Sequence, residues 1–298
     1  MLQIVYSYYQ KGDLDVRGAQ KELLRSLQKL YDLYHYLLLL ITVLTDMEQK
    51  RADAQLHRYL SVGEKVFDSE RFINNRFAEQ LRQNEALQHF ANKNGYLWDD
   101  GDQVFLRNLS FKILESPIYK EYSKGPDTYE ADRNFWRRVL DKIVNTDEEI
   151  DDVLEEKCIY WNSDWAIVLT FVEKTIRRFE ESTPVTQPLL PMFAQEDDKL
   201  FAMDLVRFAI QGKESSDVLI EEYIQNWDIE RLSTLDLCVM ELGVAEIRNF
   251  PSIPIVVSLN EYVELARYYS TPKSFQFING ILDAIAIKLK ADGQLFKN

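Results

Sequence analysis

Hydrophobic residues recur at helical spacing along most of this chain. Near the amino terminus one apolar stripe advances in steps of four and three residues, through Leu23, Leu27, Leu30, Tyr34, Leu37, Ile41 and Leu44. Neighbouring leucines widen the stripe, which predicts a long helix buried on most sides. Residues 132–154, with a break near Asn145, and residues 165–181 show the same period and also predict helices.

Proline and glycine mark the gaps between the predicted helices. Residues 92–103 and 116–128 carry Gly and Pro turn signals and are interpreted as loops. Residues 182–191 hold three prolines in ten positions, which excludes a regular helix there. This proline-rich segment is the best candidate for an internal domain boundary.

Capping signals predict further helices after this boundary. They are Ser233 with Asp236, a capping box of Ser258 with Glu261, and Thr271 before Pro272. The last predicted helix buries Ile278, Leu282, Ile285 and Leu289. Only residues 253–257 are rich in β-branched side chains, and that run is short and contains a proline. The chain is therefore predicted to be all-α.

Charge and composition narrow the function classes. The 298 residues carry a net charge of −14, which argues against a protein that coats nucleic acid without specificity but leaves room for a local basic patch. Two cysteines cannot form a disulfide framework, so we expect a reducing compartment and a cytoplasmic protein. The start has no signal-like basic stretch, and the longest apolar run, residues 36–44, is shorter than the roughly 20 residues that span a membrane.

Motifs of enzyme chemistry are absent from the sequence. It contains no glycine-rich phosphate loop, no His-Glu-x-x-His and no Glu-x-x-His. His35, His57 and His89 are interpreted as structural or solvated, and the acidic run at residues 147–156 as a solvated helix start. We expect no cofactor, no metal site and no catalytic activity.

The carboxyl-terminal third carries an ordered set of short matches to a known family. They are Ala245-Glu246-Ile247, Ile253-Pro254, residues 259–267 (LNEYVELAR) and residues 277–283 (FINGILD). Residues 201–231, with Trp227 and Arg231, also fit, and residues 2–7 resemble the family's first helix. In this order the matches resemble the bacterial transcription antitermination factor NusB family, whose fold is an all-helical bundle of two packed subdomains.

The resemblance divides the chain into three parts. Residues 1–49 and 196–298 resemble the NusB-like helices, so residues 50–195 are predicted to be a helical insertion that enlarges the bundle. A faint repeat at an offset of 66 residues pairs Phe135 with Phe201 and Trp161 with Trp227. It is either chance similarity or a second copy of the NusB helical hairpin.

The resemblance implies a non-catalytic RNA-binding adaptor. Family members pair with the ribosomal protein NusE, bind boxA-type RNA and join the RNA polymerase elongation complex on ribosomal RNA operons. Tyr6 and Asp236 match the positions that contact NusE, which is basic and therefore suits an acidic chain. The alternatives are core packing for Tyr6 and a helix-capping role for Asp236, which is compatible with partner contact.

Five residues match the RNA side of the family, namely Gln3, Tyr269, Lys273, Ser274 and Phe277. Aromatic rings stack on unpaired bases, while lysine and hydroxyl groups meet phosphates or base edges. The alternative for the two aromatics is that they are core residues at helix ends. Asn279 and Gly280 are expected to shape the helix or its packing rather than to touch RNA.

Several features depart from the family pattern. No arginine-rich arm precedes Leu2, so either the true start lies upstream or the arm is lacking, which would lower RNA affinity. Leu237 and Glu241 stand where the family often has basic residues. Basic clusters around Arg133 and Arg177 could replace the arm, although pairing with nearby carboxylates is the favoured interpretation.

Two rival functions follow from these departures. A protein-only scaffold would keep the NusE surface and lose RNA binding. An RNA-modifying enzyme with a NusB-like domain would need a cofactor-binding α/β domain with glycine-rich turns, which this sequence lacks.

Overall fold

The structure is a computed structural model that describes residues 1–12, 15–56, 68–93, 97–161, 165–224, 232–271 and 274–295. All regular elements in these ranges are helices, which confirms the all-α prediction. The α-helices are α1 (Leu2–Lys11), α2 (Val16–Leu56), α3 (Glu70–Ile73), α4 (Arg76–Gln83), α5 (Glu85–Lys93), α6 (Gln103–Glu115), α7 (Pro117–Lys124), α8 (Tyr129–Lys142), α9 (Ile150–Lys157), α10 (Trp165–Arg178), α11 (Glu196–Gln211), α12 (Lys213–Glu221), α13 (Thr234–Asn249), α14 (Ile255–Tyr269) and α15 (Ser274–Ala291). Short 3-10 helices occur at Asp100–Asp102, Val144–Thr146 and Ile159–Trp161.

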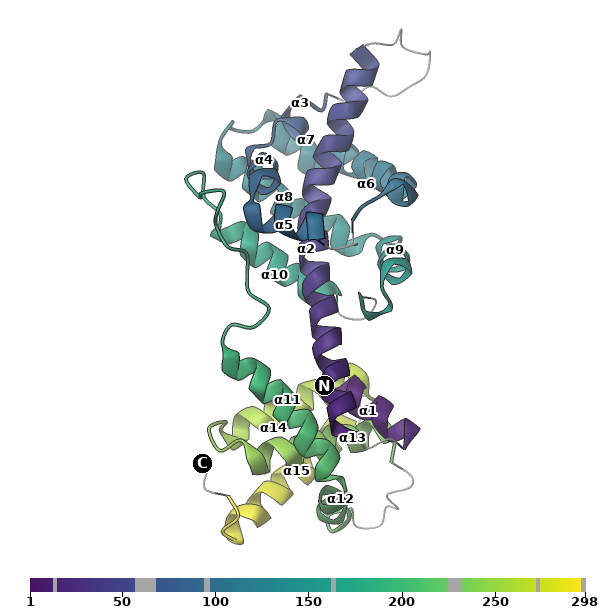
Figure 1. Cartoon of the computed structure of the whole chain (residues 1–298), viewed down its shortest axis with the longest axis vertical. Coiled ribbons are helices and arrows are strands. Elements are labelled where there is room, and N and C mark those ends of the chain that lie inside the picture. Colours follow the sequence, from purple (N-terminus) through teal and green to yellow (C-terminus); the bar gives the residue numbers. More distant parts are fainter. Residues whose placement is uncertain are drawn as a thin grey trace. The chain divides into compact units, whose positions relative to one another are not determined.

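The chain forms two compact units (Figure 1). The terminal unit consists of Met1–Arg25 and Phe193–Asn298, and the central unit consists of Ser26–Met192. The second division lies directly after the proline-rich segment, residues 182–191, which forms no helix. The first division lies within α2, which continues through residue 49, the predicted end of the first part, without a break.

The central unit is built around helix α2, which confirms the long helix predicted from the leucine stripe. Residues 36–41 of this helix are buried, and aromatic side chains from other helices join them in the core. An 18-residue window of α2 is apolar enough to cross a membrane by length and composition, and 72% of that window is buried in the fold. Core packing of α2 accounts for its apolar composition.

The terminal unit is built around helix α13, which contacts α1, α11, α12, α14 and α15. Residues 238–247 of α13 are all buried. Gly243 allows close packing, because a Cβ atom at this position would lie 2.9 Å from Leu282 Cδ1. The residues predicted for the buried face of the last helix, Ile278, Leu282, Ile285 and Leu289, are buried in α15.

The predicted loop at residues 116–128 is wrong over most of its length, because residues 117–124 form helix α7. The Ser116 hydroxyl caps this helix by accepting a hydrogen bond from the Tyr119 N–H at 3.1 Å. Pro117 occupies the first helical position, where its missing N–H carries no penalty. The Ser-Pro pair therefore starts a helix instead of a turn.

The predicted capping box of Ser258 and Glu261 is also wrong. Helix α14 begins at Ile255 after Pro254, so Ser258 lies inside the helix and is fully buried. The fixed backbone of proline favours a helix start one turn earlier than the serine. Packing of α14 against α13 and α15 buries Ser258, whereas Val256 and Val257 of the same first turn stay exposed.

Candidate RNA and partner interface

Asp236 connects the start of α13 with the start of α15. Its Oδ2 atom accepts a hydrogen bond from Ser274 Oγ at 3.0 Å, and its Oδ1 atom accepts one from Ser270 Oγ. Its backbone N–H donates to Ser233 Oγ at 3.0 Å, so Ser233 caps α13 as predicted. The Asp236 side chain is only 7% exposed. The structure thus brings together one predicted partner residue and one predicted RNA residue.

The hydroxyl protons of this cluster have one consistent arrangement. Thr271 Oγ1 and Ser274 Oγ lie 2.8 Å apart, and either could be the donor by distance alone. A carboxylate only accepts, so the single Ser274 hydroxyl proton points to Asp236. Thr271 therefore donates to Ser274. We call Asp236, Ser270, Thr271 and Ser274 the hydroxyl cluster.

Aromatic side chains flank the hydroxyl cluster at the end of α14 and the start of α15. Tyr268 is 69% exposed, and its ring lies 5.0 Å from the half-buried ring of Tyr269 in an edge-to-face arrangement. The Arg267 guanidinium lies over the Phe275 ring at 4.7 Å and pairs with the Glu264 carboxylate at 2.8 Å. Phe277 is half-buried on α15. An exposed aromatic ring such as that of Tyr268 can stack an unpaired base.

Lys273, which the resemblance assigns to RNA binding, lies outside the described residues, as does Pro272 of the predicted cap. Sequence reasoning missed two neighbours that the structure places at this surface, Tyr268 and Ser270. Their signal was the unusual density of tyrosine and hydroxyl residues between α14 and α15.

Helix α1 carries the remaining predicted residues, Gln3 and Tyr6. Leu2, Ile4 and Val5 are buried, whereas Gln3 is exposed and Tyr6 is 37% exposed. The helix packs against α11 and α13 and ends at Gly12, whose positive φ of 62° closes the last turn. Tyr6 is thus available at the surface.

Glu241 lies in the interior instead of at a surface that could repel RNA. It is fully buried on α13, and Lys213 Nζ donates to its Oε1 at 2.8 Å and to Asp217 Oδ2 at 2.9 Å. The Lys213 ammonium also lies 4.8 Å from the centre of the Tyr9 ring. Burial and the neighbouring Asp217 carboxylate raise the pKa of Glu241 to about 8, against the opposing effect of Lys213.

Three arginines of the basic clusters in the central unit are engaged by other groups. Arg138 pairs with Glu121 at 2.8 Å, Arg177 with Glu173 at 3.5 Å, and Arg133 donates to the Phe179 carbonyl at 2.7 Å. These contacts favour the interpretation that the clusters are structural.

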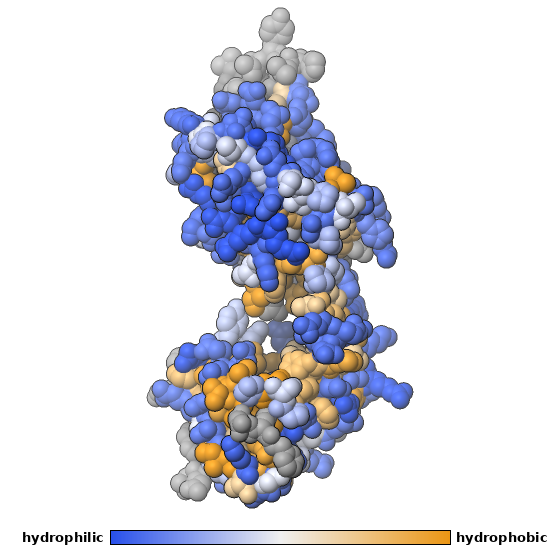
Figure 2. All heavy atoms as spheres, turned by 90° about the vertical axis from the view of Figure 1, so that its left-hand side faces the viewer, coloured by the Kyte–Doolittle hydropathy of each residue, from blue (hydrophilic) through white to orange (hydrophobic). Residues whose placement is uncertain are grey.

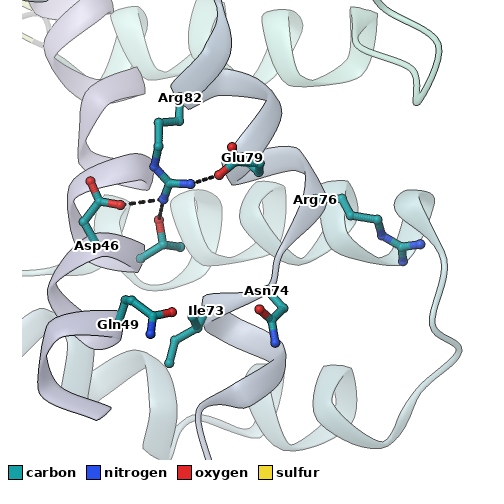
Figure 3. A pocket seen from close by; sticks show the side chains of 8 residues that line it. Asp46, Gln49, Ile73, Asn74, Arg76, Glu79 and Arg82 are labelled. Atoms are coloured by element: carbon teal, nitrogen blue, oxygen red, sulfur yellow. Dashed lines mark hydrogen bonds and ion pairs between the residues drawn. The ribbon is translucent and has the colours of Figure 1, made fainter. Parts of the chain in front are cut away.

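A polar hollow of about 380 Å³ lies between α2, α3 and α4 in the central unit (Figure 3). Arg82 points between Asp46 and Glu79 and bonds to both, whereas Arg76 points away from this group. Arg76 is itself paired with Asp127 and Asp132. Both arginines already face carboxylates, so the hollow offers weak attraction to an RNA phosphate. In the part of the chain that the structure describes, no cluster of His, Cys, Asp and Glu is arranged to hold a metal ion.

The terminal unit exposes apolar side chains beyond Tyr6. Figure 2 shows hydrophobic residues among hydrophilic ones on the surface of this unit. The exposed apolar residues of the unit include Leu200, Val218, Val256, Val257 and Ile287. Scattered residues of this kind are common on soluble proteins and do not by themselves define a site.

Comparisons with known proteins match this unit and the end of the preceding one. The sequence model of the NusB family matches residues 173–287. The transcription antitermination protein NusB of Koribacter versatilis is 40% identical over 98 residues, which cover 33% of this chain and 67% of the relative. The NusB protein of Salinibacter ruber is 34% identical over 108 residues, or 36% of this chain and 68% of the relative.

A third relative, the NusB protein of Thermodesulfovibrio yellowstonii, is 37% identical over 116 residues. These residues cover 39% of this chain and 72% of the relative. No solved structure matches the chain. The matched region contains the hydroxyl cluster and helices α11 to α14 in full.

Proposed function

This chain belongs to the NusB family, and from that premise we propose that it is a non-catalytic adaptor that pairs with NusE and binds boxA-type RNA. The relatives are named transcription antitermination proteins, which supports a role in antitermination. The adaptor would act in the cytoplasm, on the RNA polymerase elongation complex.

One observation supports this proposal most strongly. The end of α14 carries an exposed tyrosine and a second aromatic ring, and these directly precede the hydrogen-bonded hydroxyl groups in the sequence. Proteins recognise single-stranded RNA by stacking bases on aromatic rings and by bonding their edges and backbone. We assign Tyr269, Lys273, Ser274 and Phe277 to this RNA surface, with Tyr268 added, and Gln3 to its α1 side.

The partner surface is assigned to Tyr6 on α1 and Asp236 on α13. Tyr6 is exposed and amphipathic, which suits a contact residue at a protein interface. The net charge of −14 favours encounter with a basic protein such as NusE. Because Asp236 is largely buried, Tyr6 would provide most of the contact area of the two.

A fluorescence-anisotropy titration tests the proposal. Labelled boxA-type RNA is titrated with the full chain, alone and with NusE, at two salt concentrations, with an RNA of scrambled sequence as control. The proposal predicts specific binding that NusE tightens and that weakens as salt is raised, because phosphate contacts release counterions. A stable complex with NusE without RNA binding would instead identify the protein-only scaffold.

A further inference from the structure

We propose that Asp236 is a positioning residue that holds the end of α14 and the start of α15 in the arrangement that binds RNA. This inference rests on the proposed function, since it concerns the same RNA surface. It assigns to Asp236 a role within the chain, in addition to the partner contact that the family resemblance implies.

The geometry of the hydroxyl cluster carries the inference. Both carboxylate oxygens of Asp236 accept hydroxyl groups, and these come from the two ends of the same connection, Ser270 at the end of α14 and Ser274 at the start of α15. The bonds span 34 and 38 residues of sequence. One buried side chain on α13 therefore fixes both ends of the connection.

These bonds are of the kind that orders a loop. Hydrogen bonds to a charged acceptor are stronger than neutral ones, and Asp236 is 7% exposed, so water competes weakly. The backbone adds a further tie, since the Ser274 N–H donates to the Thr271 carbonyl at 3.0 Å. Ser270, Thr271 and Ser274 are thus held in place before RNA arrives, so they lose less conformational entropy on binding.

The proton arrangement limits what Ser274 can do. Its hydroxyl proton is directed to Asp236, and one of its lone pairs accepts from Thr271. Phosphate oxygens only accept hydrogen bonds, so Ser274 cannot bond to a phosphate while it donates to Asp236. Its free lone pair can accept from an RNA 2′-hydroxyl or a base amino group. Ser274 is therefore expected to contribute to RNA binding by accepting a hydrogen bond from RNA and by holding the start of α15 in place.

The same carboxylate also links the RNA surface to the partner surface. An ionised carboxylate has about four lone-pair sites, and the two side-chain hydrogen bonds use two of them. A basic group of NusE that reaches Asp236 would hold the carboxylate in place and so favour its bonds to Ser270 and Ser274. By linkage, RNA binding would then strengthen NusE binding by the same factor.

Two variants test the positioning role with two measurements. Ser270→Ala removes one bond and leaves the Asp236 charge, whereas Asp236→Asn removes the charge and one acceptor with little change of shape. Ser123→Ala, on helix α7 of the central unit, is the matched control because its hydroxyl donates to the Lys120 carbonyl of its own helix. Hydrogen exchange is measured across the connection without RNA, and RNA affinity is measured at several salt concentrations.

We expect both variants to speed exchange at the connection alone and to lower RNA affinity by about tenfold, the effect of one such hydrogen bond. The salt slope should stay unchanged, since no phosphate contact is lost. A double variant that combines Ser270→Ala with Asp236→Asn should bind RNA no more weakly than Asp236→Asn alone, because both changes act through one hydrogen-bond network.

Unchanged exchange in both variants, or a salt slope that falls by about one, would overturn the positioning role. Fully additive losses in the double variant would also contradict it. If the unmodified chain fails to bind boxA-type RNA, the proposed function fails, while the exchange measurement still decides whether Asp236 orders the connection.

Discussion

Ser274 Oγ on α15 donates to Asp236 Oδ2 on α13 at 3.0 Å. The family resemblance assigns Ser274 to RNA and Asp236 to the protein partner, as separate surfaces. In the structure they belong to one hydrogen-bonded cluster, which Ser270 and Thr271 complete. A change at either surface is therefore expected to reach the other.

The exposed ring of Tyr268 gives the first prediction. Tyr268→Ala should weaken boxA-type RNA binding by about 1–3 kcal/mol if the ring stacks on a base, whereas Tyr268→Phe should bind almost normally. Phe171→Ala, at an exposed ring of the central unit, is the control. Anisotropy titrations should show this loss with an unchanged salt slope. Equal affinity of the alanine variant and the unmodified chain would remove Tyr268 from the RNA surface.

Tyr6 provides a prediction about the partner. Tyr6→Ala should weaken NusE binding by about 1 kcal/mol or more, because an exposed aromatic residue at an interface often contributes strongly. Binding of RNA by the chain alone should change little. Gln10→Ala, at an exposed position on the same helix, is the control for effects on α1. Calorimetric titration with NusE measures these affinities. Equal losses of NusE affinity in the Tyr6 and Gln10 variants would argue against a specific contact of Tyr6.

The buried carboxyl group of Glu241 gives a pH dependence. Its pKa is raised from 4.5 to about 8, chiefly by burial, so the fold favours the protonated form. Stability should therefore fall as pH rises from about 4.5 to about 8, by at most about 1.4 kcal/mol per pH unit. Glu241→Gln removes the titrating group and keeps its shape. Denaturant unfolding at several pH values should show a flatter profile for this variant.

The surroundings of Glu241 explain why glutamine is the informative substitution. Glu241 Oε2 and Asp217 Oδ1 are both buried, and neither has a hydrogen-bond donor among the described residues. A proton on Glu241, or the amide of glutamine, supplies such a donor. Lys213 stays in place to neutralise Asp217. Parallel pH profiles for the variant and the unmodified chain would mean that Glu241 titrates normally.

Two helical glycines should respond in opposite ways to substitution. Gly280 is exposed on α15 with open space where a Cβ would lie, so Gly280→Ala should stabilise the fold by about 1 kcal/mol through helix propensity. Gly243→Ala should destabilise it, because Leu282 and Tyr262 occupy the space. Thermal unfolding distinguishes them. A destabilised Gly280→Ala variant would contradict this account of α15.

Much of the helical framework was predictable because it depends on local spacing. The stripe through Leu37 and Ile41 identified α2, and the break near Asn145 falls in the 3-10 helix between α8 and α9. The first residues of helices were harder to predict, since serine and proline occur both in turns and at helix starts. The sequence around Ser116 and Pro117 is typical of a turn but begins helix α7. Ser258 has the features of a helix cap but lies inside α14, which begins directly after Pro254.

The candidate site was predictable only in part, and only through resemblance. Matched motifs identified Asp236 and Ser274, but no local pattern shows that residues 38 positions apart share a hydrogen bond. For the same reason, the sequence showed Glu241 only as a departure from a position that is often basic in the family, whereas tertiary packing buries it beside Lys213. Contacts across the bundle decide these roles, and they depend on how α13 packs against its neighbours.

The central claim is that one chain binds NusE and boxA-type RNA together, and reciprocal coupling tests it most directly. The affinity of the chain for NusE would be measured by calorimetry, without RNA and with saturating boxA-type RNA. The account predicts that boxA-type RNA tightens NusE binding by the factor with which NusE tightens RNA binding, and that scrambled RNA has no effect. NusE affinity that is the same with and without boxA-type RNA, or no NusE binding at all, would contradict it.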